Sequence, residues 1–230
     1  MKTKQESSKN TLVVKDLSHA YTDSQRRVEV LKGINATFEG GTFYAIVGES
    51  GSSKTTFLSL LSALDTIQSG DIRYNGESIK KIGAQNFRLK YSNIVFQSFN
   101  LIKYMTAREN VEVGIDFAGK YRGPSKKEYA YELLDKVGIT RQEADRLVQR
   151  LSGGQQQRVA IARSMAGDVP IILADEPTGN LDERTEDKVL ALFRSLANDG
   201  KIVVVVTHSQ KVASHADAVV YHMKDGVLTK

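Results

Sequence analysis

The stretch "YAIVGESGSSKTTFLSLL", residues 44–61, decides the fold class of this 230-residue chain. An apolar run is followed by a glycine-rich turn, and Lys54 and Thr55 then open a second apolar segment. This order matches the phosphate-binding pattern G-x-x-x-x-G-K-[ST], in which backbone N–H groups surround the phosphates of a nucleotide. The match is incomplete, because Ser53 stands where the pattern has its second glycine.

The composition limits the classes of protein to consider. Hydrophobic residues make up 40% of the chain, and no apolar run reaches the roughly 18–20 residues that span a bilayer. The chain has no cysteine, which excludes disulfides and thiol-based metal sites. Its net charge of +5 is spread among acidic residues without a basic block, so we expect no nucleic-acid partner. We expect a cytoplasmic protein in which residues 1–10 form a flexible tail and residues 11–230 a single domain.

Apolar patterning around the loop predicts an α/β protein. Residues 42–47 have the pattern of a buried strand, and residues 55–64 that of a helix packed against it. Two further apolar runs, 169–176 and 201–208, are continuous, as in parallel strands covered on both faces. The amphipathic segment 183–199 between them is predicted to be their crossover helix.

Antiparallel signals lie toward the two ends of the chain. The β-branched residues of 11–21 and 28–38 predict an N-terminal antiparallel β subdomain, and Asn75-Gly76 predicts a hairpin turn after it. Residues 217–230 predict a second hairpin, which turns at Asp225-Gly226. With the parallel strands, this hairpin predicts a mixed central sheet.

A repeated capping pattern predicts helices between the two halves of the sheet. Three times within thirty residues a Ser or Thr is followed three positions later by Glu or Gln. The pairs are Ser125 with Glu128, Thr140 with Glu143, and Ser152 with Gln155. We therefore expect an inserted α-helical subdomain at about residues 98–165.

The apolar run "IILADE", residues 171–176, ends in two consecutive carboxylates. Ligands of open α/β sheets bind at the carboxyl ends of the strands. Asp175 is suited to hold Mg²⁺, directly or through water, and Glu176 to polarise an attacking water. Two solvated carboxylates at a strand end would be the structural alternative, but the phosphate-loop pattern favours the functional interpretation.

The segment "LSGGQQQR", residues 151–158, gives the most specific signal. With the loop and the paired carboxylates in the same order, the chain resembles the ATPase subunit of ATP-binding cassette (ABC) transporters over about residues 11–228, and Leu-Ser-Gly-Gly-Gln matches the signature of that family. Ser152 and the amides of Gly153 and Gly154 would form a nest for anionic oxygen. The resemblance implies that this nest faces the γ-phosphate bound by a second ATPase subunit.

The resemblance also implies roles for residues at matching positions. Tyr21 resembles the aromatic residue that stacks on adenine, with a core tyrosine as the structural alternative. Gln97 resembles the glutamine that touches Mg²⁺ or the lytic water and links to the membrane subunit. Asp182 resembles an aspartate at the dimer interface, a role compatible with capping the following helix. His208, at the end of the valine-rich strand, resembles the histidine that bonds the γ-phosphate.

The complete implied site has three groups of residues. Nucleotide contacts are Tyr21, Gly48, Glu49, Ser50, Gly51, Ser52, Ser53, Lys54, Thr55, Thr56, Ser152, Gly153, Gly154, Gln155 and Asp182. Metal contacts are Thr55, Gln97 and Asp175, and the catalytic residues are Glu176, His208 and Gln97. Among the four histidines His208 is preferred over His19, His215 and His222, because only His208 ends an apparent central strand.

The resemblance implies an ATPase that uses ATP and Mg²⁺ and works as a head-to-tail dimer on the inner face of the cell membrane. Its partners would be a second ATPase subunit, identical or different, and an integral membrane permease. "FNLIKYMTARENV" (99–111) and "ADEPTGNLD" (174–182) most resemble lipoprotein-releasing, macrolide-export and antimicrobial-peptide-export ATPases. Export or extraction is therefore favoured over import, and the sequence does not indicate the substrate.

Two alternatives stay open. The first is a soluble ABC ATPase without a transport role, which acts on nucleic acid or Fe–S assembly machinery. Translation-type members usually carry two cassettes in one chain and repair-type members carry long coiled-coil insertions, and this chain has neither. The second is a regulatory or scaffold subunit with little turnover, which the similar cell-division ATPase and Ser53 both suggest. A serine forced into a sparsely populated backbone region costs about 1–3 kcal/mol, or about five-fold to more than a hundred-fold in affinity. We therefore expect Ser53 to weaken ATP binding without abolishing it.

Overall fold

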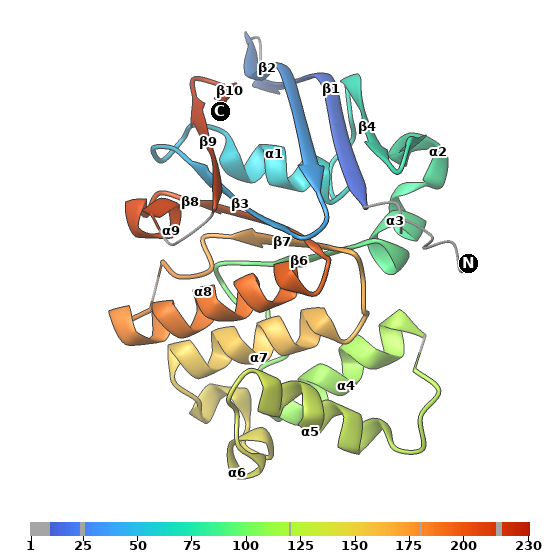
Figure 1. Ribbon diagram of the computed structural model, residues 1–230, viewed down its shortest axis with the longest axis vertical. Helices are drawn as coiled ribbons and strands as arrows, with labels where there is room; N and C mark the ends of the chain where they lie inside the picture. The colour runs from blue at the N-terminus through green and yellow to red at the C-terminus, as the bar shows by residue number, and fades with distance from the viewer. Residues whose placement is uncertain (1–9, 24–25, 120, 180, 215–217) are drawn as a thin grey trace, which may run out of the picture.

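The computed structural model describes residues 10–23, 26–119, 121–179, 181–214 and 218–230 (Figure 1). The predicted tail lies outside these residues except for Asn10, and so does His215. The described residues form an α/β fold with two sheets, which confirms the predicted class. No described helix combines the length and the apolar character needed to cross a membrane.

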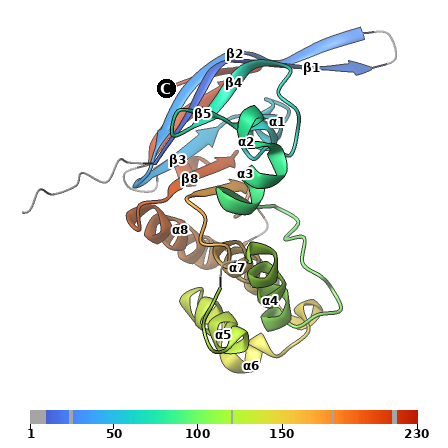
Figure 2. The same cartoon turned by 90° about the vertical axis from the view of Figure 1, so that its right-hand side faces the viewer.

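The smaller sheet is antiparallel and has the order β2-β1-β4-β5. Its strands are β1 (Thr11–Asp23), β2 (Arg26–Glu39), β4 (Ser69–Tyr74) and β5 (Glu77–Ser78). The hairpin turn at Asn75-Gly76 has φ angles of 48° and 85°, as a tight two-residue turn requires. Figure 2 shows β1 and β2 running together past the edge of the fold.

The larger sheet is mixed, as predicted, and has the order β10-β9-β3-β8-β7-β6. Its strands are β3 (Thr42–Val47), β6 (Ser92–Val95), β7 (Ile171–Asp175), β8 (Ile202–Thr207), β9 (Val219–Lys224) and β10 (Val227–Thr229). All neighbouring pairs are parallel except β9 and β10, which form the predicted hairpin at Asp225-Gly226. The strand before the glycine-rich loop therefore lies inside the sheet, beside β8.

Helices cover both faces of this sheet. The helix α1 (Lys54–Leu61) lies between the two sheets, and the longer helices pack on the opposite face (Figures 1 and 2). Besides α1, the described helices are α2 (Ile79–Ile82), α3 (Ala84–Lys90), α4 (Ala107–Ala118), α5 (Lys126–Lys136), α6 (Arg141–Ala144), η1 (Val148–Arg150), α7 (Gly153–Met165), α8 (Glu183–Asn198) and α9 (Gln210–Ser214). The limits 98–165 of a separate helical subdomain stay a prediction.

Alternation along β3 divides the apolar core into two parts. Tyr44 and Ile46 face a cluster with α1 and the antiparallel sheet, whereas Phe43, Ala45 and Val47 face a cluster with α4, α5, α7 and α8. The strand is buried on both faces, so its apolar run is continuous, as parallel strands require.

Some predicted boundaries were wrong. The helix after the loop ends at Leu61 and not at residue 64, because Ala63 has a φ of 55°, outside the helical region. The strand β6 and the capping box that Thr106 and Glu109 form at the start of α4 were not predicted. At α5, Ser125 accepts a hydrogen bond from the Glu128 backbone N–H, which is half of the predicted capping box.

Candidate nucleotide-binding and hydrolysis site

The glycine-rich loop connects the end of β3 at Val47 to the start of α1 at Lys54. The Lys54 ammonium lies inside the loop, where Nζ donates to the carbonyl oxygens of Gly48 at 2.8 Å and Glu49 at 2.9 Å. Gly51 has a φ of 82°, which glycine adopts readily. The first N–H groups of α1 have no intrahelical partners and carry the positive end of the helix dipole. The loop therefore presents cationic and N–H groups suited to phosphate oxygens.

Ser53 occupies the position immediately before α1 and has a left-handed backbone, with φ 76° and ψ 19°. Its side chain makes no capping hydrogen bond to the helix. Glycine enters this region without penalty, whereas a residue with a Cβ pays about 1–2 kcal/mol. The backbone strain considered from the sequence is therefore present in the fold.

A cavity of about 620 Å³ opens beside the loop. It brings together ten of the predicted residues from four parts of the chain: Ser50, Gly51, Ser53, Lys54, Thr55, Thr56, Gln97, Asp175, Glu176 and His208. The Thr55 hydroxyl donates to the Asp175 carboxylate at 3.3 Å, across 120 residues of sequence. The predicted metal-binding and catalytic residues therefore line the same cavity.

Glu176 is held at the cavity wall by the end of β8. One carboxylate oxygen, Oε2, accepts from the Thr207 hydroxyl at 3.1 Å and lies 3.0 Å from His208 Nδ1. Glu176 has a φ of 44°, an uncommon value for a residue that is not glycine, of the kind that clusters at functional sites. Burial raises the pKa of the neighbouring Asp175 carboxyl, and the Glu176 charge raises it further.

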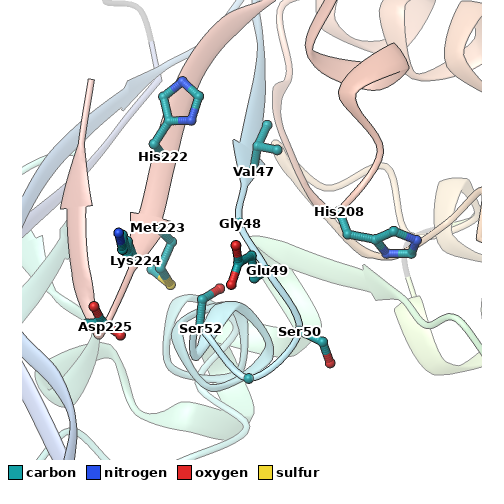
Figure 3. Close-up of a pocket in the computed structure, with 11 residues that line it drawn as sticks. Val47, Gly48, Glu49, Ser50, Ser52, His208, His222, Met223, Lys224 and Asp225 are labelled. Atoms are coloured by element: carbon teal, nitrogen blue, oxygen red, sulfur yellow. The ribbon is translucent and has the colours of Figure 1, made fainter.

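A second cavity of about 450 Å³ lies on the other side of the loop (Figure 3). The predicted residues Gly48, Glu49 and Ser52 line it, and Ser50, Gly51 and His208 border both cavities. The strand β9 and the turn after it form the opposite wall, with His222, Met223, Lys224 and Asp225. Of these two histidines, His222 lines only the second cavity, whereas His208, the histidine preferred from the sequence, lines both.

Tyr21 stands near the start of α1 rather than in the core. Its side chain is 48% exposed, its hydroxyl lies 3.5 Å from the Thr56 hydroxyl, and its ring meets the buried His19 ring edge-on at 4.9 Å. The core-tyrosine alternative is therefore wrong. An exposed ring beside the loop is in a position to stack on a base.

The predicted signature residues Ser152 to Gln155 line neither cavity, and the same is true of Asp182. Ser152 caps α7 with a full capping box, in which its hydroxyl accepts from the Gln155 N–H and Gln155 Oε1 accepts from the Ser152 N–H. Asp182 caps α8, accepting from the Thr185 N–H at 3.0 Å and the Thr185 hydroxyl at 2.7 Å, and these bonds lower the pKa of the Asp182 carboxyl. Both segments begin helices and lie outside the two cavities beside the loop.

The comparison with protein families decides between the possible nucleotide-binding classes. The family described as ABC transporter matches residues 31–179, which contain the loop, Gln97, the signature and the paired carboxylates. The chain belongs to the ABC transporter family. It is an ATP-binding cassette with the ATPase fold and activity of that family.

Relatives agree with this assignment. The ABC ATPase is 47% identical over 189 residues to YclH of Bacillus subtilis, named an uncharacterized ABC transporter ATP-binding protein, covering 82% of this chain and 83% of YclH. It is 41% identical to an ABC transporter ATP-binding protein of Thermotoga maritima, covering 95% and 93% of the two chains. It is 37% identical to MacB of Mannheimia succiniciproducens, a macrolide export ATP-binding/permease protein, and spans 34% of that longer chain.

Solved structures agree as well. The ABC ATPase resembles dimeric MJ0796, a bacterial ABC transporter cassette, with a TM-score of 0.86, 36% identity and coverage of 95% of this chain and 97% of the other. A second MJ0796 dimer with the same scores is described as a post-hydrolysis state bound to ADP and Pi.

One residue that bonds to the Glu176 carboxylate was not predicted from the sequence. Thr207 is buried, and its hydroxyl donates a hydrogen bond to Glu176 Oε2 and accepts one from the Ser209 N–H at 3.0 Å. The bond to Glu176 connects the end of β8 to the carboxylate that follows β7. The position of Thr207 just before His208 at a strand end was the available signal.

Proposed function

We propose that this ABC ATPase is the Mg²⁺-dependent, ATP-hydrolysing subunit of a membrane transporter that exports or extracts a peptide, lipoprotein or drug. The observation that carries the proposal is the cavity where Lys54, Thr55, Asp175, Glu176 and His208 converge. The MacB name, which joins an ATP-binding part and a permease in one export protein, supports the direction of transport.

The donor set beside Lys54 fits Mg²⁺. Thr55 and Asp175 offer oxygen atoms, which are the ligands Mg²⁺ prefers, and their side chains already meet at 3.3 Å. Gln97 adds an amide oxygen at the same cavity. A bound Mg²⁺ would neutralise charge on the β- and γ-phosphates, and Thr55, Asp175 and Gln97 would hold it there.

Glu176 is the proposed general base, because an acceptor for the proton of the attacking water must lie close to the γ-phosphate. Thr207 and His208 orient its Oε2 atom, which leaves Oε1 as the atom directed to water. His208 is largely exposed and would also bond the γ-phosphate. Tyr21 would stack on adenine, and Lys54 would contact the terminal phosphates.

We propose that the active form is a head-to-tail dimer with an identical or different ATPase subunit. The residues Ser152 to Gln155, outside the chain's own cavity, would cover the ATP held by the partner's loop. The dimers of MJ0796, 36% identical to this chain, support such a pairing. ATP would then join the two subunits, and hydrolysis would separate them.

The proposed contact with the permease is an apolar hollow of about 340 Å³ between α3, β6, α4 and α7, lined by Leu89, Asn93, Ile94, Ile102, Val113, Gly114, Phe117, Ala118, Ala160, Arg163, Ser164 and Gly167. Phe117 lines the hollow and is 75% exposed, and Tyr104, two residues after the lining residue Ile102, is 80% exposed. Large exposed apolar side chains around a hollow are typical of protein interfaces. This face would hold the ATPase at the inner, cytoplasmic face of the cell membrane.

The test is phosphate release by the purified protein, with Glu176→Gln and Lys54→Ala as variants. We expect Mg-ATP hydrolysis that falls about 10²–10⁴-fold in Glu176→Gln, the usual contribution of a general base. The Glu176→Gln protein should still dimerise with Mg-ATP, whereas Lys54→Ala should not. Wild-type release at background level with intact dimerisation would instead favour the regulatory or scaffold alternative. Normal hydrolysis in Glu176→Gln would remove Glu176 from its role.

A further inference from the structure

A carboxylate outside the proposed ATP site contacts the signature. Glu143, in the short helix α6, accepts at Oε1 a 2.6 Å hydrogen bond from Gln155 Nε2. Its other oxygen, Oε2, accepts from the Thr140 N–H and hydroxyl, both at 2.8 Å. The capping box of α6 and the capping box of α7 are thereby joined through one carboxylate.

The contact fixes which way the Gln155 amide points. A glutamine side chain ends in an acceptor oxygen and a donor nitrogen of nearly equal shape, and only its partners determine the orientation. The hydrogen bond from the Thr140 backbone N–H contributes most to lowering the pKa of the Glu143 carboxyl, and Gln155 and the nearby Arg158 charge add to it. Glu143 is therefore ionised at neutral pH and can only accept. It holds Nε2, so that Oε1 turns toward the Ser152 N–H at 2.8 Å.

The orientation of Gln155 determines which N–H groups the signature offers. The first four N–H groups of a helix have no intrahelical partner. In α7, Gln155 occupies the Ser152 N–H, and the Ser152 hydroxyl accepts from the Gln155 N–H. The amides of Gly153 and Gly154 are left between these two bonds, at an end of the helix where Ser152 and Gly153 are exposed.

We propose that Glu143 is a positioning residue for the signature, which acts through Gln155 to hold the Ser152–Gly154 backbone in the shape that receives a phosphate of the partner's ATP. The proposal rests on the proposed function in one respect, namely that the signature of one subunit completes the ATP site of the other. Because Glu143 belongs to α6 and the signature to α7, movement between these two helices would be transmitted to the nest.

The matched control is Thr140→Ala. It removes the hydroxyl that accepts from the Glu143 N–H and donates to Glu143 Oε2, but keeps the Thr140 N–H bonded to Oε2 and the bond between Glu143 Oε1 and Gln155. A purely structural role for Glu143 would give Glu143→Ala and Thr140→Ala similar effects. A positioning role affects the signature in Glu143→Ala alone.

An exchanged pair gives a rescue. In Gln155→Glu, two carboxylates would face each other, because Oε1 must still accept from the Ser152 N–H. In Glu143→Gln/Gln155→Glu, the new amide can accept from Thr140 with its oxygen and donate to residue 155 with its nitrogen. Every donor in the chain of bonds then has an acceptor again.

The first measurement is hydrogen exchange of the Ser152 amide by nuclear magnetic resonance, without nucleotide. In Glu143→Ala the freed Gln155 amide no longer holds its oxygen at the Ser152 N–H, and losing that neutral hydrogen bond should speed exchange about two- to tenfold, whereas Thr140→Ala should stay near wild type. The second is Mg-ATP-dependent dimerisation of the same variants in the Glu176→Gln background. Since each dimer contains two signatures, its dissociation constant should rise by the square, about four- to hundredfold. The double exchange should recover what Gln155→Glu loses.

Unchanged exchange at Ser152 in Glu143→Ala would overturn the proposal, and so would a double exchange no better than Gln155→Glu. If exchange at Ser152 rises as expected but the Glu176→Gln parent does not dimerise with Mg-ATP, the proposed function is wrong and the positioning role stands. Binding of Mg-ATP to the monomer should be the same in Glu143→Ala and its parent.

Discussion

Ser53→Gly is the substitution whose effect the structure specifies most closely. Ser53 has φ 76° and ψ 19°, in the left-handed region, where a residue with a Cβ pays about 1–2 kcal/mol. This value lies within the range of about 1–3 kcal/mol for residues held in sparsely populated backbone regions, of which the left-handed region is one. Glycine removes this cost. At about 1.4 kcal/mol for each factor of ten, the strain corresponds to about five-fold to thirty-fold in an equilibrium constant.

The free energy that Ser53→Gly gains by removing the backbone strain is divided between two measurable quantities, the affinity for Mg-ATP and the free energy of unfolding. If the loop relaxes when it is free, Ser53→Gly tightens Mg-ATP binding by up to this factor. If the loop keeps its shape, the gain appears in the free energy of unfolding, reduced by roughly 0.5–1 kcal/mol because glycine has more freedom in the unfolded chain. Isothermal titration with Mg-ATP and urea unfolding measure the two parts.

Ser53→Ala is the control, because alanine keeps the Cβ and lacks the hydroxyl. If backbone strain is the cause, Ser53→Ala should behave like wild type in both assays. The reasoning would be refuted if Ser53→Gly bound Mg-ATP with wild-type affinity and its unfolding free energy were lowered by the full cost of glycine's freedom in the unfolded chain, with no strain relief to offset it. A large loss of affinity in Ser53→Ala would show that the serine hydroxyl binds phosphate.

Three further predictions concern the same site and its partner surface. Thr207→Val removes the hydroxyl that donates to Glu176 and should lower the rate of phosphate release several-fold at unchanged Mg-ATP affinity; an unchanged rate would exclude Thr207 from orienting Glu176. Burial raises the pKa of Asp175, so the folded protein holds this proton more tightly than the unfolded chain, and unfolding free energy falls as pH rises from the ordinary aspartate value through the raised one. Asp175→Asn should remove that slope and, without Mg²⁺, be more stable than wild type at about pH 7 in urea unfolding; a retained slope would assign it to another group. A Cβ on Gly154 would lie 2.5 Å from Thr185 Cγ2, so Gly154→Ala should destabilise the fold by about 1–3 kcal/mol, and Thr185→Ser, which lacks that methyl, should restore it in thermal unfolding.

The sequence predicted the parts of the fold that local patterns determine. The strands β3, β7 and β8, the helix α8 and both hairpin turns lie where their apolar period or turn residues indicated. The strand β6 was missed because its four residues, Ser92–Val95, are too few to show a period and form a strand only by pairing with β7. Pairing between distant segments is not a local property.

The site shows the same division. The ten residues around the larger cavity were predicted individually, but only the folded chain joins Thr55 to Asp175 and Glu176 to Thr207. The capping patterns of Glu143 and Gln155 were also predicted, whereas the bond between them depends on how α6 lies against α7. The left-handed backbone of Ser53 could be anticipated only as a consequence of the missing glycine.

The central claim, an ATP site shared by two subunits, is tested most directly by mixing two defective proteins in the Glu176→Gln background. Lys54→Ala removes the loop's cation, and Gly153→Asp places a negative charge in the signature, where a Cβ meets its nearest neighbour only at 4.0 Å. Neither variant should dimerise with Mg-ATP alone. Their mixture should form heterodimers that retain one ATP each, because one loop and one signature are intact at the same site. A mixture that stays monomeric, while the Glu176→Gln parent dimerises, would contradict the shared site.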